Sequence, residues 1–189
     1  MNDLVPSRAP QTSGEEEDGA QYLTFTLGGE MFALGILNVK EIIEFGSITE
    51  IPMMPGFIRG VINLRGAVVP VIDLSSRFGG HPTPISRRTC IVIVELQEDD
   101  QRQDIGVVVD AVSEVLEIPH SEIEPPPPFG AKIRADFIYG MGKINGRFVI
   151  ILNIAKVLSI DEIALLGQLA GEDAPPPAPG AAAPQLASP

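Results

Sequence analysis

The sequence predicts a mainly β protein made of two similar halves. Its apolar residues are dominated by Val, Ile and Leu, and it contains no Trp; branched side chains favour the pleated surface of a strand. Short apolar runs alternate with Gly, Pro and Asp, a pattern typical of a barrel or a sandwich. The runs that predict strands are residues 22–27, 31–35, 60–63, 67–73, 89–96, 105–109, 141–144 and 147–153.

An internal repeat indicates the two halves. Residues 57–74 match residues 137–154 at a constant offset of 80, glycines included. Residues 39–44 resemble residues 112–117 at an offset of 73, so the second copy has about seven extra residues, where the prolines of 125–128 lie. Because each half alone would bury little surface, we expect two small barrels that share an apolar seam.

The two ends of the chain are predicted to be disordered. Residues 1–20 are rich in acids, and residues 172–189 are rich in Pro, Ala and Gly, so neither end has much apolar surface to bury. The folded domain is then expected at residues 21–171, with its halves near 28–80 and 89–158.

Helical signals are sparse. The apolar positions of residues 36–44 fit a helix or a strand, and both alternatives remain open. Ser159 and Glu162 form the Ser-x-x-Glu pattern of a capping box, which predicts a C-terminal helix over 160–169.

Composition and motifs argue against several classes of function. The net charge of -12 would repel nucleic acid and acidic lipid. No apolar run reaches the roughly 20 residues of a membrane span, and the polar N-terminus does not resemble a secretion signal, so we expect a cytoplasmic protein. Cys90, the only cysteine, is expected to be a small buried hydrophobe, and His81 and His120 adjoin prolines in loop contexts. The sequence shows no catalytic, nucleotide-binding or zinc motif, which favours a non-enzymatic binding module without cofactor or metal.

The tightest turns of the two copies differ. The second copy has Asn145-Gly146, whose residues both tolerate positive φ, whereas the first copy has Arg65-Gly66. Arginine suits positive φ poorly, so either the turn differs, for instance by a bulge, or the side chain is kept for another purpose. An ordinary solvated arginine on a hairpin tip is the simpler alternative.

Residues 57–74, 105–112 and 114–116 closely resemble the CheW family of bacterial chemotaxis coupling proteins. Residues 137–154 and the helix expected near the C-terminal end extend the resemblance over the whole predicted folded region. The resemblance implies two SH3-like, five-stranded β-barrel subdomains that share a core, with short helices. It also implies an adaptor that couples the cytoplasmic tips of chemoreceptors (methyl-accepting chemotaxis proteins) to the regulatory domain of the histidine kinase CheA. Such an adaptor is cytoplasmic and recruited to membrane-associated receptor arrays, without direct membrane insertion.

The resemblance also implies a set of partner-binding residues. A receptor tip is a helical hairpin, so a groove between the barrels could receive its apolar side chains while Glu41 and Arg65 fix the register at the rim. Val39 could instead be core. Two other functions remain open: the same scaffold role in a non-flagellar chemosensory-like pathway, and a small-ligand sensor or enzyme with a site in the groove. The residues that match the family's partner-binding positions are Val39, Glu41, Arg59, Gly60, Asn63, Leu64 and Arg65.

Overall fold

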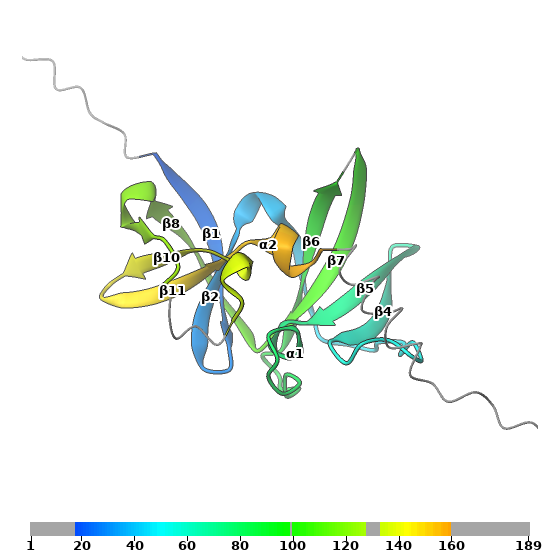
Figure 1. Cartoon of the computed structure of the whole chain (residues 1–189). Helices are drawn as coiled ribbons and strands as arrows, with labels where there is room; N and C mark the ends of the chain where they lie inside the picture. The colour runs from blue at the N-terminus through cyan, green and yellow to red at the C-terminus, as the bar shows by residue number, and fades with distance from the viewer. Residues whose placement is uncertain (1–17, 99, 128–132, 160–189) are drawn as a thin grey trace, which may run out of the picture.

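The computed structural model describes residues 18–98, 100–127 and 133–159, which form two strongly twisted sheets side by side (Figure 1). The sheet that we call barrel 1 has the strand order β3-β6-β7-β5-β4, and barrel 2 has the order β8-β1-β2-β11-β10-β9. The strands of barrel 1 are β3 (Val39–Glu44), β4 (Ile58–Leu64), β5 (Ala67–Asp73), β6 (Cys90–Glu98) and β7 (Gln101–Val109). The strands of barrel 2 are β1 (Gly19–Leu27), β2 (Glu30–Gly35), β8 (Ala111–Pro119), β9 (Ile123–Glu124), β10 (Ile138–Ile144) and β11 (Arg147–Leu152).

The predicted mainly β fold with two small barrels is confirmed, and each predicted run overlaps a strand. Four details differ from the prediction. No strand run was predicted over residues 111–119, which form β8. Barrel 2 has a sixth strand, because the short β9 pairs with the outer edge of β10. The ambiguous residues 36–44 form a short 3-10 helix, η1 (Ile36–Asn38), followed by β3. The predicted N-terminal tail, 1–20, is too long, because Gly19 already pairs with Pro119 in β1.

The helix predicted at 160–169 and the tail predicted at 172–189 lie outside the described residues.

The two sequence copies exchange their first hairpins. The first copy runs from β1 to β5 and the second from β6 to β11, yet the β1–β2 hairpin lies in barrel 2 and the β6–β7 hairpin lies in barrel 1. The exchange is symmetric, since β2 pairs with β11 and β7 pairs with β5, both in parallel. The predicted subdomain bounds, 28–80 and 89–158, therefore follow the sequence copies and do not match the barrels, because strands of both copies hydrogen-bond within each sheet.

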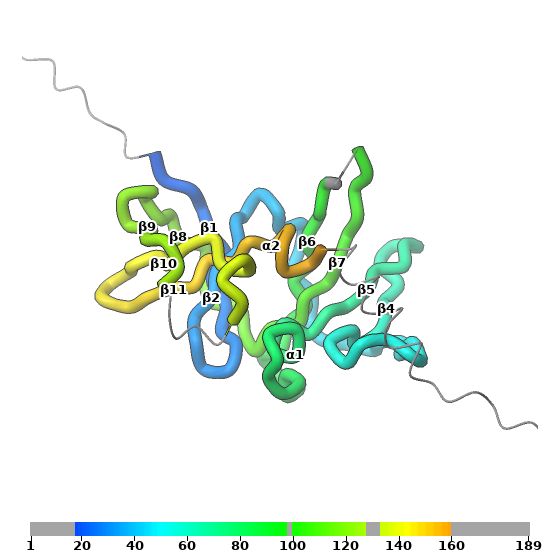
Figure 2. Tube along the Cα trace, in the orientation of Figure 1, coloured from blue at the N-terminus to red at the C-terminus, as the bar shows by residue number. Residues whose placement is uncertain are grey.

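Two one-turn helices follow the repeat. α1 (Leu74–Arg77) and α2 (Ile154–Val157) start 80 residues apart, and each is capped by the residue before it. The side chain of Asp73 accepts from the backbone N–H of Ser76, and that of Asn153 accepts from the backbone N–H of Lys156. Side-chain caps of this kind satisfy backbone donors that a helix leaves unpaired at its start. Figure 2 shows both helices near the junction of the two barrels.

Three apolar clusters hold the fold together. One fills barrel 1, around Val71 and Ile91, and one fills barrel 2, around Tyr22 and Ile151. The largest lies between the barrels and draws residues from both sheets. A chain of contacting aromatic rings runs through this shared core, and its members are Phe25, Phe32, Phe78 and Phe137. The predicted shared seam is thus the main core of the molecule, and burial of its apolar surface holds the two barrels together.

Candidate partner-binding surfaces

The β4–β5 turn has the same backbone form as its copy in barrel 2. Arg65 and Gly66 have φ of 53° and 87°, and Asn145 and Gly146 have φ of 48° and 77°. Two central residues with positive φ make the two-residue hairpin turn that suits the right-handed twist of strands. The alternative that the Arg65 turn differs by a bulge is therefore wrong. Arg65 is held in the left-handed region, which costs an L-residue with a full side chain roughly 1–2 kcal/mol.

The Arg65 guanidinium makes a two-point ion pair with Glu41. Arg65 Nη1 and Nη2 donate to Glu41 Oε1 and Oε2, each at 2.8 Å. Glu41 lies on β3, one edge strand of barrel 1, and the turn extends from β4, the other edge strand. The Arg65 side chain is 77% exposed and that of Glu41 is 25% exposed. The pair thus connects the two edges of the barrel 1 sheet at a place that solvent and a partner can reach.

Two further predicted residues support this turn. Asn63 Oδ1 accepts a hydrogen bond from the backbone N–H of Gly66 at 2.9 Å. Leu64 is half-buried and packs against the apolar cluster inside barrel 1. We call Glu41, Asn63 and Arg65 together the hairpin tip. Its backbone and its charged pair are both fixed by neighbours in the same barrel.

Arg59 is directed into the protein rather than toward a partner. Its Nε and Nη2 donate to Asp73 Oδ2 at 2.9 and 2.7 Å, and Nη2 also donates to the carbonyl O of Thr83 at 2.7 Å. Asp73 is fully buried and also accepts from the N–H and hydroxyl of Thr83. Arg59 thereby connects β4, the cap of α1 and the loop at Thr83, which is a structural network.

Gly60 is required by the backbone. It lies at a bulge of β4 with φ of 142°, and a Cβ at this position would overlap the carbonyl O of Thr49. Thr49 and Val61 form a backbone bridge at that point. Only glycine permits such a close approach. Gly60 therefore shapes the strand that carries the hairpin tip.

Val39 begins β3 and is half-buried against the core that the barrels share. A register shift between Val39 and Glu41 separates the two residues in their pairing with β6. The structure thus favours the core interpretation of Val39. The seven predicted residues divide into a hairpin tip and residues that support the barrel around it.

A groove of about 560 Å³ lies between the barrels. Leu37 of η1, 97% exposed, and Tyr139 of β10, 55% exposed, are its most accessible apolar side chains. Glu95 of barrel 1 lies on its wall, where Lys40 approaches it at 3.5 Å. The predicted groove exists, but Glu41 and Arg65 do not line it, so their predicted place at its rim is not what the structure shows. The lining residues are Tyr22, Gly35, Leu37, Asn38, Glu95, Leu96, Gln97, Tyr139, Ile151, Leu152, Asn153, Ile154, Ala155 and Leu158.

The sequence prediction missed Leu37 and Tyr139. Tyr139 occupies the position that matches Arg59 in the first copy, so the offset of 80 contains a signal: a cation in one copy is replaced by an aromatic residue in the other. Leu37 lies in residues 36–44, whose pattern fitted either a helix or a strand. Because the two structures expose different side chains, the exposure of Leu37 could not be predicted.

Tyr22 lines the groove and has a raised pKa. Burial and, to a smaller extent, the neighbouring Tyr139 raise the pKa of Tyr22 above its ordinary value of 10.0. The raised pKa extends to higher pH the range over which the Tyr22 hydroxyl is a hydrogen-bond donor as well as an acceptor. Among residues 18–98, 100–127 and 133–159, no group of three or more His, Cys, Asp or Glu side chains is arranged to hold a metal ion.

Comparison with known proteins gives consistent results. A CheW-like domain model matches residues 21–162. Chemotaxis protein CheW of Klebsiella aerogenes is 36% identical over 155 residues, which cover 82% of this chain and 91% of that protein. Protein FrzA of Myxococcus xanthus is 29% identical over 157 residues, covering 82% of this chain and 94% of that protein. The crystal structure of the scaffolding protein TtCheW from Thermoanaerobacter tengcongensis is similar with a TM-score of 0.67 and 38% identity, covering 76% of this chain and 94% of that chain. The chain therefore belongs to the CheW family.

Proposed function

We propose that the protein is a non-enzymatic, cytoplasmic adaptor of chemotaxis signalling. It holds the cytoplasmic tip of a chemoreceptor and the regulatory domain of the histidine kinase CheA at the same time, in membrane-associated arrays. The observation that carries the proposal is Arg65, which is exposed and kept in the left-handed region where the copied turn has asparagine. Residues held in unfavourable backbone regions are concentrated at functional sites. Within the described residues, no helix is long and apolar enough to cross a membrane.

The groove between the barrels is the proposed receptor site. A receptor tip is a helical hairpin, and a helix presents apolar side chains at regular spacing along one face. Leu37 and Tyr139 offer exposed apolar surface to such a face, and the Glu95 carboxylate offers an acceptor to a polar or basic side chain beside it. Aromatic side chains are frequent among residues that dominate binding energy.

The hairpin tip is the proposed kinase site. It does not line the groove, so a protein bound at the tip and a helical hairpin bound in the groove can be held together. The guanidinium is well suited to paired carboxylate or carbonyl acceptors on a partner. Arg59, Gly60, Leu64 and Val39 contribute by fixing the strands around the tip, as their internal contacts indicate.

Coupling in this proposal needs no covalent chemistry. Two partners on one rigid scaffold have an effective concentration toward each other that reaches the millimolar range for short connections. A scaffold that binds one kinase conformation better than another also shifts the kinase toward that conformation. Receptor occupancy is then transmitted through the geometry of the complex.

Co-sedimentation with receptor-bearing membranes tests the proposal. Purified kinase is mixed with the membranes and with wild-type protein, Arg65→Glu, Glu41→Arg, or the double variant that exchanges the two charges. We expect wild type to recruit the kinase and both single variants to recruit less. The double variant should remain defective, because it restores the internal ion pair but presents the wrong charges to the partner. Arg87→Glu, at an exposed arginine in another turn, is the matched control and should behave as wild type.

Different failures of this experiment have different meanings. A wild-type protein that recruits no kinase would remove the adaptor role itself. Full recovery by the double variant would show that Glu41 and Arg65 act only within their own barrel. For the groove, Leu37→Glu should lower binding of the protein to receptor membranes without kinase, while Ile85→Glu, at an apolar residue that is 61% exposed elsewhere, should not.

The groove also fits a second candidate function. Its volume falls within the roughly 300–1,000 Å³ of small-molecule sites, as a small-ligand sensor would need. A sensor predicts saturable binding of a metabolite by the isolated protein, and calorimetry against a metabolite panel distinguishes it from the adaptor. The remaining alternative is the same scaffold role in a non-flagellar chemosensory-like pathway. It is tested by repeating the co-sedimentation with membranes that carry the receptors of such a pathway.

A further inference from the structure

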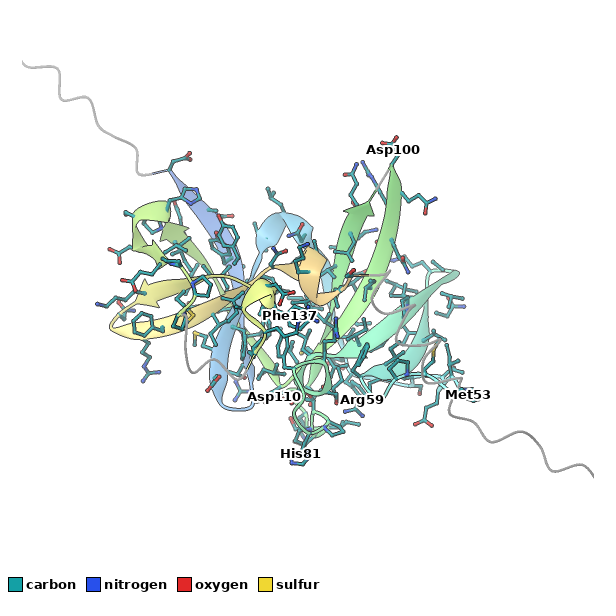
Figure 3. All side chains as sticks on the ribbon, in the orientation of Figure 1. Met53, Arg59, His81, Asp100, Asp110 and Phe137 are labelled. Atoms are coloured by element: carbon teal, nitrogen blue, oxygen red, sulfur yellow. The ribbon has the colours of Figure 1, made fainter. Side chains whose placement is uncertain are left out.

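One arginine contacts both barrels at their junction. Arg77 ends α1, and its guanidinium carbon lies 4.9 Å from the ring centroid of Phe57 and 4.9 Å from that of Phe137. Phe57 precedes β4 of barrel 1, and Phe137 precedes β10 of barrel 2; Figure 3 shows Phe137 at the junction of the two sheets. The cation therefore lies against two rings that occupy the same position in the two sequence copies, in a geometry that attracts a guanidinium to each ring.

The same side chain also holds the other short helix. Arg77 Nε donates to the carbonyl O of Val157, the last residue of α2, at 3.0 Å. Ile154, Ala155 and Leu158, on either side of Val157, line the groove between the barrels. Arg77 is thus attached both to the barrel junction and to the helix that forms one wall of the groove.

The contact is asymmetric although the fold is nearly symmetric. The offset of 80 places Val157 where a second copy of Arg77 would lie. Two guanidinium groups against the same pair of rings would repel each other, whereas one can contact both. A single side chain of the first copy therefore makes contacts that lie on both sides of the junction.

We propose that Arg77 is a positioning residue that fixes the angle between the two barrels and, through α2, the width of the groove. The shared core between the barrels is apolar, and apolar contact has little directional preference. The paired ring contacts and the hydrogen bond of Arg77 are directional, and packed elements without such contacts can slide past one another. The angle is a property of the protein alone, whereas its consequence for receptor and kinase rests on the proposed function.

Distance measurement between spin labels tests the angle directly. In the full chain with Cys90→Ser, labels are attached to Gln103→Cys on β7 and Lys143→Cys on β10, two exposed positions in different barrels. We expect Arg77→Met to broaden or shift the distribution of label distances while circular dichroism stays that of the folded protein. Arg134→Met is the matched control, since the Arg134 guanidinium lies 4.7 Å from the same Phe137 ring and pairs with Asp136 in the segment that leads into β10. It should leave the distribution as in the wild type.

A second variant keeps the test decisive if Arg77→Met does not fold. Arg77→Lys keeps the positive charge but lacks the planar group and the Nε donor, so it should give an intermediate distribution. Unchanged distributions in the folded Arg77 variants, or equal broadening by Arg134→Met, would overturn the proposal.

Kinase recruitment is then measured separately for the Arg77 variants. We expect them to bind the kinase alone as wild type does, to bind receptor membranes less well because the groove width changes, and to lose simultaneous recruitment. If the distances change but recruitment does not, the positioning role stands and its assigned consequence for coupling fails. If wild type itself recruits no kinase, the failure lies with the proposed function.

Discussion

Replacing Arg65 by asparagine should separate the stability of the hairpin from its function. The change copies Asn145 into the equivalent turn, whose φ of 48° is close to the 53° of Arg65. Relief of the left-handed backbone stabilises the fold by roughly 1–2 kcal/mol. Loss of the Glu41 pair costs only about 0.2–1 kcal/mol, because the Arg65 side chain is 77% exposed and solvent screens the charges. The free energy of unfolding of the variant should therefore equal that of wild type or exceed it by up to about 1.8 kcal/mol.

Urea denaturation measures this difference, provided that the slope against urea concentration is the same for both proteins. Kinase recruitment by the same preparations should fall, although the protein is at least as stable. Arg87→Asn controls for the loss of one exposed positive charge. A variant that is less stable than wild type by more than about 1 kcal/mol would show that Arg65 stabilises the barrel. Undiminished recruitment would show that its side chain is not needed by a partner.

Three further predictions concern the residues around the site. Gly60→Ala should lower the free energy of unfolding by about 3 kcal/mol or more, or prevent folding, because the added Cβ would overlap a backbone carbonyl at a residue with positive φ. Urea denaturation measures the change, and Gly56→Ala, where nothing lies within 4 Å of the added Cβ, is the control that should have little effect. Asp73→Asn should cost roughly 3 kcal/mol by leaving the Arg59 charge without its buried partner, and adding Arg59→Tyr, which copies the second repeat, should recover part of that loss in a double-mutant cycle. The Tyr22 pKa is raised in the folded state, so its stabilising contribution is complete below pH 10 and is lost as pH rises above 10; Tyr22→Phe should unfold with less pH dependence over that range, and identical pH profiles would contradict the assignment.

Much of the fold could be predicted because its strands are short, branched and separated by turn residues. The edge strand β3 could not be assigned, because its burial alternates while Ile42 and Ile43 are adjacent, a spacing that also fits a helix. The repeat showed which segments are equivalent. It could not show which hairpin joins which barrel. The strands β5 and β11 have the same sequence pattern, so either could pair in parallel with β2 or with β7.

The candidate site was predictable to a smaller extent. Comparison of the two turns identified Arg65 as unusual, and the structure explains why: the backbone is the same and only the side chain differs. The pairing of Arg65 with Glu41 depends on two sheet edges coming together, which no local pattern contains. Arg59 matched a functional position of the family. The sequence does not reveal that the buried carboxylate of Asp73, 14 residues further along the chain, lies beside it in space.

The exchanged hairpins also affect how the chain is completed during synthesis. Barrel 1 needs strands from residue 39 to residue 109, and barrel 2 needs strands from residue 19 to residue 152. An emerging first copy therefore has a β1–β2 hairpin without its barrel partners: β1 waits for β8, which ends at residue 119, and β2 waits for β11, which ends at residue 152. Pairings so distant in sequence form slowly, and exposed strands are open to wrong partners while they wait. A break in the chain between the two copies would leave neither fragment with a complete barrel, although the two together contain every strand that both barrels require.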